Sequence, residues 1–248
     1  MKQVMLVTGG GRGIGAATAL LASRRGYAVC INYRSNAATA EKLRAQIVAE
    51  GGEAIAVRAD VGVEAEVLRL FAAVDAELGP VTALVNNVGV LEQQCKLVDM
   101  SVERLQRVFT TNIVSYFLCS REAVRRMSTR LGGQGGGIVN VGSGASRHGA
   151  GNVYVDYAAS KGAIDVFTLG LSKEVGAEGI RVNCVRPGII YTDIHASGGD
   201  PDRVDKLAST VPMQRGGQPE EIAETILWLL GPQSSYVSGA LIDAGGAR

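Results

Sequence analysis

Residues 4–15 read Val-Met-Leu-Val-Thr-Gly-Gly-Gly-Arg-Gly-Ile-Gly, an apolar run that leads directly into a cluster of glycines. The apolar residues 4–7 predict a buried strand, and the Ala- and Leu-rich residues 13–25 predict a helix. Glycines allow a sharp turn and a close approach of the backbone to a pyrophosphate, and the start of a helix offers free N–H groups. This strand–turn–helix arrangement predicts a dinucleotide site, although the string Gly11-x-Gly13-x-x-Ala16 alone is weak.

Short apolar runs alternate with helical patterns along the rest of the chain. Further strands are expected at residues 28–32, 54–58, 81–85, 137–141, 180–185 and 241–243. Further helices are expected at residues 37–50, 67–78, 102–130, 156–175 and 219–230. This alternation is typical of an α/β fold, a Rossmann-type doubly wound parallel sheet with helices on both faces in three layers. No linker-like shift in composition interrupts the pattern, so residues 1–248 are expected to form a single domain.

Composition excludes several classes of protein. The 25 Lys and Arg residues balance 24 Asp and Glu residues, so there is no basic excess for nucleic acid or an anionic membrane. No apolar stretch approaches the roughly 18 residues of a membrane span. The four cysteines lie far apart and only two histidines occur, which favours neither a disulfide framework nor a metal site. A cytoplasmic protein without a metal is therefore expected.

The segment after the second strand bears on the choice between NADP and NAD. An acidic residue there would bind the ribose 2′-hydroxyl of NAD, but residues 31–36 read Ile-Asn-Tyr-Arg-Ser-Asn, without a carboxylate. Arg34, together with Arg12 of the glycine turn, would instead hold a 2′-phosphate through charge-assisted hydrogen bonds. The sequence favours NADP, while the alternative is that both arginines are solvated surface groups.

Tyr157 and Lys161 are four residues apart on a predicted helix, so the phenol and the ammonium share one face. An unperturbed tyrosine has a pKa of about 10, and a nearby cation favours the phenolate and lowers that pKa. The pair is therefore a candidate general acid/base unit, although a Y-x-x-x-K spacing is common by chance.

A joint pattern of motifs is more specific than any one of them. In order along the chain these are Thr8-Gly9-x-x-x-Gly13-x-Gly15, Asn86-Asn87-Val88-Gly89, Asn112, Ser143, Tyr157-x-x-x-Lys161 and Pro187-Gly188-x-x-x-Thr192. In this order and spacing the sequence resembles the short-chain dehydrogenases/reductases of the single-domain type, over essentially its whole length. The resemblance implies an NADP-dependent oxidoreductase acting on an alcohol or carbonyl compound.

The resemblance also implies roles for particular residues. Tyr157 would be the acid/base, Lys161 would lower its pKa and bind the nicotinamide ribose, and Ser143 would hold the substrate oxygen. Asn112 would kink a helix and position a water in the proton relay. The implied cofactor contacts are Gly9, Gly11, Arg12, Gly13, Ile14, Gly15, Arg34, Asp60, Val61, Asn86, Gly89, Tyr157, Lys161, Pro187, Gly188, Ile190 and Thr192. A mobile substrate lid over about residues 190–217 and a homotetramer are implied as well.

Departures from the family pattern leave alternatives open. Val88 replaces the usual alanine, Gly142 stands where a first serine is usual, and the usual C-terminal Asp-Gly-Gly reads Asp-Ala-Gly-Gly at residues 243–246. Ser146 is a fallback if the register slips. Ser143 lies 14 residues before Tyr157, one more than is common, which leaves room for a one-residue insertion in residues 147–155. Tyr154 is interpreted as a substrate-side or packing residue because no lysine follows it at helical spacing. His148 is interpreted as an exposed loop residue and His195 as part of the lid.

Two other functions remain as alternatives. A catalytically inactive dinucleotide-binding sensor or scaffold would keep this fold, but the chain retains all four of the residues that the resemblance marks as catalytic. A serine hydrolase using Ser143 and His148 is a more distant alternative, because no G-x-S-x-G elbow is present.

Overall fold

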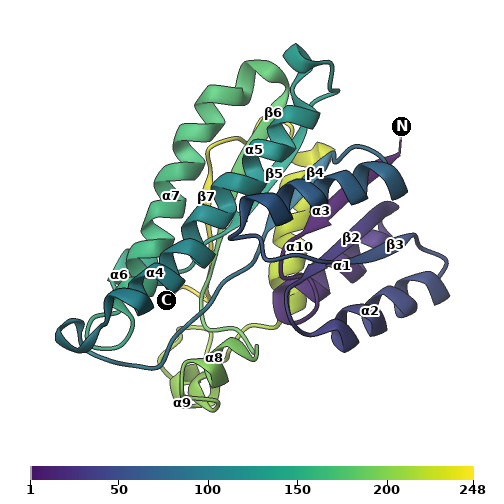
Figure 1. The fold of residues 1–248 in the computed structure, drawn as a ribbon. Coiled ribbons are helices and arrows are strands. Elements are labelled where there is room, and N and C mark those ends of the chain that lie inside the picture. The colour runs from purple at the N-terminus through teal and green to yellow at the C-terminus, as the bar shows by residue number, and fades with distance from the viewer. Residues whose placement is uncertain (1) are drawn as a thin grey trace.

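Seven parallel strands form one sheet in the computed structural model, which describes residues 2–248 (Figure 1). The strand order is β3-β2-β1-β4-β5-β6-β7, so the direction of winding reverses between β1 and β4. The Rossmann-type doubly wound sheet predicted from the sequence is confirmed. The strands are β1 (Gln3–Val7), β2 (Tyr27–Tyr33), β3 (Ala54–Arg58), β4 (Ala83–Asn86), β5 (Gly136–Val141), β6 (Ile180–Pro187) and β7 (Leu241–Ala244).

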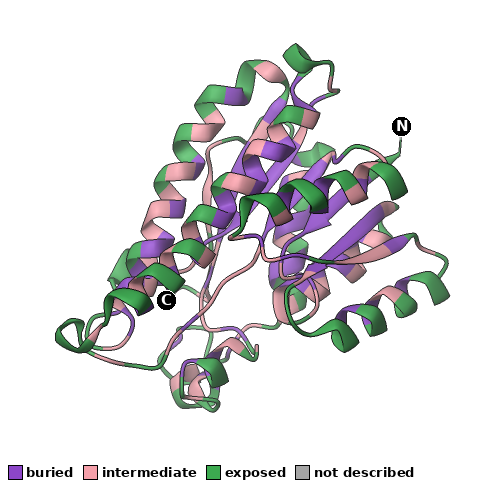
Figure 2. Cartoon of the chain, in the orientation of Figure 1, coloured by how far each residue is buried: buried purple, intermediate pink, exposed green. Residues whose placement is uncertain are grey.

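Helices cover both faces of the sheet. One face packs against α1 (Gly13–Arg24), α2 (Ala37–Ala49) and α10 (Pro219–Leu230). The other face packs against α3 (Glu64–Glu77), α5 (Ser115–Met127) and α7 (Val155–Val175), and α4 (Val102–Phe109) leads into α5. Figure 2 shows the resulting layers, with buried strands between helices whose outer surfaces are exposed.

The apolar strands are explained by burial on both faces. Val4 and Leu6 of β1 pack against α3 and α5, whereas Met5 and Val7 pack against α1 and α10, because successive side chains of a strand point to opposite faces. All four residues are at most 1% exposed. Since neither face of the strand meets water, its sequence is a continuous apolar run rather than an alternating one.

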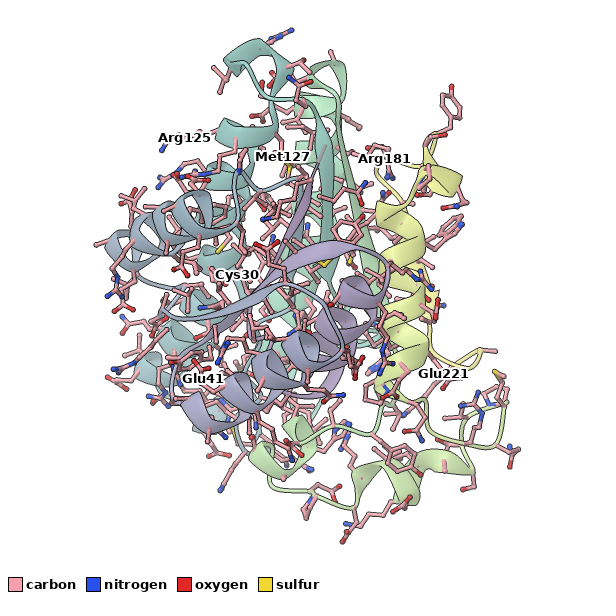
Figure 3. The ribbon with its side chains drawn as sticks, turned by 90° about the vertical axis from the view of Figure 1, so that its right-hand side faces the viewer. Cys30, Glu41, Arg125, Met127, Arg181 and Glu221 are labelled. Carbon is pink, nitrogen blue, oxygen red and sulfur yellow. The ribbon has the colours of Figure 1, made fainter. Side chains whose placement is uncertain are left out.

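Both ends of α10 have their backbone groups satisfied by side chains. Glu221 in the first turn accepts a hydrogen bond from the Gln218 N–H at 2.8 Å, and Pro219 occupies the first turn, where no N–H is needed. At the other end, Arg181 Nη1 donates to the Leu229 carbonyl at 2.6 Å. Figure 3 shows Glu221 and Arg181 at opposite ends of this helix, where a carboxylate and a cation suit the helix dipole.

The single long helix predicted over residues 102–130 is wrong in detail. A π-helical segment, Thr110–Val114, separates α4 from α5, and α5 ends at Met127 before a 3₁₀ turn, Thr129–Leu131. The side chain of Asn112, inside the π-helical segment, hydrogen-bonds to the backbone of Val90. A π-helical turn holds one residue more than an α-helical turn, and here that turn carries the contact between Asn112 and the loop at Val90. The periodicity of apolar residues along the chain does not reveal such a turn.

Other differences concern short elements. Strand β4 begins at Ala83 rather than at residue 81, because Thr82 pairs with Val4 through its side chain as well as its backbone. Three short helices were not predicted, since a helix of one turn shows no periodicity. They are α6 (Ala145–His148), α8 (Ile194–Ser197) and α9 (Arg203–Ala208).

Two kinds of feature are absent from residues 2–248. None of the helices combines the length and apolar character needed to cross a bilayer. In the same part of the chain, no three His, Cys, Asp or Glu side chains come together in a way that would hold a metal ion.

Substitution of Phe71 provides a test of how tightly α3 packs on the sheet. The ring is fully buried beneath Arg126, whose guanidinium carbon lies 4.9 Å from the ring centroid. We expect Phe71→Ala to lower the free energy of unfolding by about 3 to 5 kcal/mol, because the cavity cannot collapse fully. The control Leu68→Ala, on the same helix but 44% exposed, should cost less than about 1 kcal/mol in urea denaturation at fixed protein concentration. Equal losses for the two variants would contradict this assignment of the core.

Candidate active site

Thr8 and Asn87 join the ends of β1 and β4, where the strand order reverses. The Thr8 hydroxyl accepts hydrogen bonds from the N–H groups of Asn87 at 3.0 Å and Val88 at 3.1 Å. In return, Asn87 Nδ2 donates to the carbonyl oxygens of Thr8 at 3.0 Å and Gly9 at 3.1 Å. These bonds fix the first residues of the glycine turn against the neighbouring strand.

The glycine turn has a shape that only glycine permits. Gly9 and Gly13 have φ angles of +62° and +52°, a left-handed conformation that strains other residues. A Cβ on Gly15 would lie 2.5 Å from Asn87 Nδ2 and 2.6 Å from the Gly9 carbonyl oxygen. The first turn of α1 carries no acidic residue, so its free N–H groups face the turn without a competing carboxylate. The residues present therefore fit a diphosphate.

A cavity of about 490 Å³ runs from this turn across the carboxyl edge of the sheet. Most of the residues expected from the sequence to hold a cofactor or act in catalysis line it. These are Gly9, Gly11, Arg12, Gly13, Ile14, Arg34, Asp60, Val61, Gly89, Ser143, Tyr157, Lys161, Pro187, Gly188, Ile190 and Thr192. Gly15, Asn86 and Asn112 do not belong to its wall. Polar residues around Arg34 that sequence reasoning missed also line the cavity, namely Asn32, Ser35, Asn36 and Thr39.

Asn86 differs from its expected position in the cofactor cleft. Its Nδ2 donates to Ser120 Oγ at 3.0 Å and to Asn140 Oδ1 at 2.9 Å, inside the protein on the far side of the strand. Side chains alternate along a strand, so the next residue, Asn87, is the one that points toward the glycine turn. The signal available in the sequence was the alternation itself, since Val85 is buried and Asn87 lies two residues beyond it on the same side of the strand.

Arg12 and Arg34 lie in loose ion pairs at the end of the cavity beside the glycine turn. Arg12 Nη1 is 3.9 Å from Asp193, and Arg34 Nη1 is 3.7 Å from Asp60. The side chains of both arginines are about 60% exposed, and neither donates a side-chain hydrogen bond within residues 2–248. Such pairs contribute little stability, so both guanidinium groups are available to an anion.

Lys161 is 2% exposed and its ammonium is held by two groups. Nζ donates to the Val141 carbonyl at 2.7 Å and to the Tyr116 hydroxyl at 3.2 Å, and it lies 5.8 Å from the centroid of the Tyr157 ring. Burial lowers the pKa of Lys161 to about 8, since desolvation disfavours the charged form. Tyr116 is a member of this cluster that the sequence motifs did not reveal.

The pKa of Tyr157 shifts in the direction opposite to that expected from its sequence neighbour. Burial raises this pKa above its ordinary value, and a hydrogen bond with Ser143 only partly opposes the rise. The expected lowering by Lys161 is not seen, because the ammonium is directed to Val141 and Tyr116 and desolvation dominates. In the free protein Tyr157 is therefore a neutral phenol at pH 7.

Ser143, rather than Ser146, faces the cavity. The Ser146 hydroxyl donates to the Ser143 carbonyl at 2.9 Å and lies outside the cavity wall. Ser143 Oγ accepts a hydrogen bond from the Ala145 N–H at 3.1 Å at the start of α6. Behind it, a Cβ on Gly142 would lie 2.7 Å from Cys184 Sγ, so the thiol fills the space that a side chain at position 142 would need.

Asn112 is buried and holds a loop rather than lining the cavity. Its Oδ1 accepts from the Val90 N–H at 2.8 Å, and its Nδ2 donates to the Val90 carbonyl and to Ser160 Oγ, both at 3.1 Å. These bonds join the π-helical segment, the loop after β4 and α7. The side chain therefore positions the backbone beside Gly89 and Tyr157.

The first turn of α7 is anchored by a buried ion pair. Arg104 donates to both carboxylate oxygens of Asp156, at 2.7 and 3.2 Å, and its Nη1 donates to the Gln93 carbonyl at 2.6 Å. The Asp156 side chain is 1% exposed. Because Asp156 precedes Tyr157, this bidentate pair fixes the start of the helix that carries the phenol.

Tyr154, His148 and His195 line the other end of the cavity. Tyr154 is buried and donates to the Gly198 carbonyl at 3.0 Å, which joins it to the segment after α8. His148 is exposed, as expected, and its Nδ1 accepts from the Ala150 N–H at 3.2 Å. His195 Nε2 lies 3.0 Å from the Ile190 carbonyl oxygen, and within residues 2–248 its buried Nδ1 has no partner.

Comparisons with known proteins agree with this geometry. A family model described as "Enoyl-(Acyl carrier protein) reductase" matches residues 9–246. The chain is 55% identical over 245 residues to the "Uncharacterized oxidoreductase YgfF" of Escherichia coli (strain K12), covering 99% of each protein. A mutant short-chain dehydrogenase/reductase of Serratia marcescens superimposes with a TM-score of 0.90 at 31% identity, covering 99% of this chain and 97% of that one. A blue fluorescent protein from a metagenomic library, in complex with NADPH, gives the same TM-score and coverage at 32% identity.

The buried Lys161 predicts a pH-dependent stability. The unfolded chain holds this proton up to a pH near 10.5 and the folded chain releases it near 8, so stability should rise with pH between these values. Between pH 7 and 10, the free energy of unfolding should rise by about 2 to 3 kcal/mol more in the natural protein than in Lys161→Met. Urea denaturation at several pH values measures this difference. Exposed Lys173→Met is the control, and parallel pH profiles for the natural protein and Lys161→Met would contradict the assignment.

Proposed function

The chain belongs to the short-chain dehydrogenase/reductase family, and on that premise we propose that it is an NADP-dependent oxidoreductase that interconverts an alcohol and a carbonyl compound. The observation that carries this proposal is one cavity with a glycine turn and Arg34 at one end and the hydroxyls of Ser143 and Tyr157 at the other. The alternative of an inactive sensor or scaffold has no observation in its favour.

The cofactor would lie along the carboxyl edge of the sheet. The turn from Gly9 to Gly15 would hold its diphosphate, and Arg12 and Arg34 would bind the 2′-phosphate that distinguishes NADP from NAD. Asp60 and Val61 would border the adenine, and Pro187, Gly188, Ile190 and Thr192 the nicotinamide. When bound, the nicotinamide supplies or accepts the hydride. The relative that binds NADPH supports this choice of cofactor.

Tyr157 would carry the proton that balances the reaction. Because its pKa is raised, the phenol is protonated near neutral pH and is ready to donate to the oxygen of a carbonyl substrate. Ser143 would donate a hydrogen bond to the same oxygen, which orients the carbonyl and stabilises developing negative charge. In the direction of alcohol oxidation the phenolate is required, so higher pH should favour that direction.

Lys161 and Asn112 would not exchange a proton with the substrate but would hold other groups of the site in place. Lys161, on the cavity wall between Tyr157 and Val141, would bind the nicotinamide ribose and favour the phenolate once that ribose is in place. Asn112 would be a positioning residue, because it fixes the loop beside Gly89 and the helix that carries Tyr157. Residues 190–217 would form the lid over the substrate, with α8 and α9 as its rigid parts.

We propose a homotetramer in the cytoplasm. Exposed apolar side chains on α5 and α7 support an interface there, since Phe117 stacks on Phe167 at 4.0 Å between centroids and Val166 is 70% exposed. Reduced thiols support the location, because Cys30, Cys119 and Cys184 are free and buried. Light scattering of the purified protein tests the oligomeric state.

Removing the phenol tests the proposed chemistry. We expect Tyr157→Phe to lower kcat/KM for any carbonyl substrate by a factor of about 10² to 10⁴, because no other acid replaces it, while NADPH binding stays within about two-fold. The control Tyr236→Phe changes a fully exposed hydroxyl and should have the activity of the natural protein. Unchanged turnover in Tyr157→Phe would refute the assignment, and tight NADPH binding without turnover of any carbonyl would favour the sensor.

Removing one guanidinium tests the choice of cofactor. We expect Arg34→Ala to weaken NADPH binding about ten- to hundred-fold, because charge-assisted hydrogen bonds to the 2′-phosphate are lost, and to leave NADH binding nearly unchanged. Titration by nucleotide fluorescence measures both affinities. Arg44→Ala, on the exposed face of α2 and outside the cavity, is the matched control. A similar loss of affinity for both nucleotides would contradict a phosphate-binding role.

A further inference from the structure

Arg203 lies in the cavity wall at the end away from the glycine turn. It is the first residue of α9, in the segment proposed above as the lid, and its side chain is only 20% exposed. The guanidinium carbon lies 5.3 Å from the centroid of the Tyr154 ring. Stacking on an aromatic face orients the planar group and leaves its N–H edges free to bind another group.

The hydrogen-bonding capacity of Arg203 is unused. A guanidinium has five N–H donors, yet none makes a hydrogen bond with another group in residues 2–248. Its nearest carboxylate is Asp200 at 4.0 Å, and Asp200 already accepts a hydrogen bond from Lys206. Arg104, with a side chain 10% exposed, makes three hydrogen bonds with Asp156 and Gln93. Because Arg203 lines the cavity, a ligand with acceptor oxygens can bind to these free donors.

Asp200 is the nearest carboxylate to Arg203, and the cavity wall at this end adds a second donor. The carboxylates in the cavity wall are Asp60 and Asp193, which lie beside Arg34 and Arg12 at the cofactor end. His148 lines the same cavity as Arg203, and partial burial followed by the cations of Arg248 and Arg203 lowers the pKa of its imidazole. Because its Nδ1 accepts a hydrogen bond, the proton of the neutral ring lies on Nε2, which can donate.

One cluster of side chains lies between Arg203 and Tyr157. Tyr154, on which it stacks, belongs to a buried cluster with Leu91 and Ala158 that packs against Tyr157. The lid is closed down on this cluster, since a Cβ on Gly198 would lie 2.8 Å from both Leu91 and the Tyr154 hydroxyl. A ligand that contacts both Tyr157 and Arg203 must therefore pass beside the cluster that contains Tyr154.

We propose that the substrate is a carbonyl compound with an oxyanion group, a carboxylate or a phosphate, which Arg203 binds while Tyr157 faces the carbonyl. This inference rests on the proposed function, because it names the class of substrate for the same cavity. The planar fork of Arg203 matches two oxygens of either anion, and His148 supplies a further N–H.

Three benzaldehydes that differ only in the para group provide the test with NADPH. These are 4-carboxybenzaldehyde, 4-formylphenyl phosphate and 4-methylbenzaldehyde. We expect at least one anionic aldehyde to have a kcat/KM about ten-fold or more above that of the methyl compound. Arg203→Gln should remove this preference, mainly through KM, and leave the methyl compound within about two-fold. Arg203→Lys should restore part of it, because the charge returns without the fork.

A matched control and two outcomes decide the inference. Arg69→Gln, an exposed arginine on α3, should behave as the natural protein. Equal losses for all three aldehydes in Arg203→Gln would show a structural role and overturn the inference, as would an unchanged preference. The better of the two anionic aldehydes identifies the carboxylate or the phosphate as the source of the charge.

A binding measurement separates this inference from the proposed function. Calorimetry with 4-carboxybenzyl alcohol, 4-phosphooxybenzyl alcohol and 4-methylbenzyl alcohol requires no turnover. If no aldehyde is reduced but an anionic alcohol binds the natural protein and not Arg203→Gln, the anion site stands and the proposed chemistry fails. If aldehydes are reduced and Arg203→Gln binds the anionic alcohols as tightly as the natural protein, the chemistry stands and the anion site fails.

Discussion

The mutual hydrogen bonds of Thr8 and Asn87 are the constraint on which the rest of the site depends. They tie the end of β1 to the end of β4, so the turn that follows β1 cannot move away from the neighbouring strand. The same turn is held from its other side, where the Gly9 N–H donates to Asn32 Oδ1 at 3.3 Å. Because the winding of the sheet reverses here, a crevice opens above strands that are fixed on both sides.

At the opposite end of the cavity, the ammonium group of Lys161 is buried, which is unfavourable unless other groups stabilise the charge. Lys161 is stabilised by a backbone carbonyl of β5 and by Tyr116 of α5, so its position depends on the packing of two elements other than its own helix. Arg104 and Asp156 anchor that helix at its first turn. The end of the cavity beside Tyr157 is thus held by polar contacts within the core, whereas the end beside the glycine turn is bordered by the exposed Arg12 and Arg34.

Sequence reasoning succeeded where one local pattern determines the structure. The apolar run of residues 4–7 is short and ends at glycines, which favours a strand buried on both faces. The motifs after successive strands must meet at one edge of a parallel sheet. It failed where a residue acts through distant partners. The π-helical turn at Asn112 accompanies contacts with Val90, and the free edge of Arg203 becomes visible only when α9 is packed over Tyr154.

The thiol of Cys184 beneath Gly142 has a consequence for how this chain can change over evolution. Each residue occupies the volume that the other leaves, with a would-be Cβ and Sγ only 2.7 Å apart. Substituting either position alone produces a collision or a void beside Ser143, so the two positions are epistatic. A lineage that acquires a hydroxyl at position 142 therefore needs a compensating change at 184, either a smaller residue or another rotamer of the thiol.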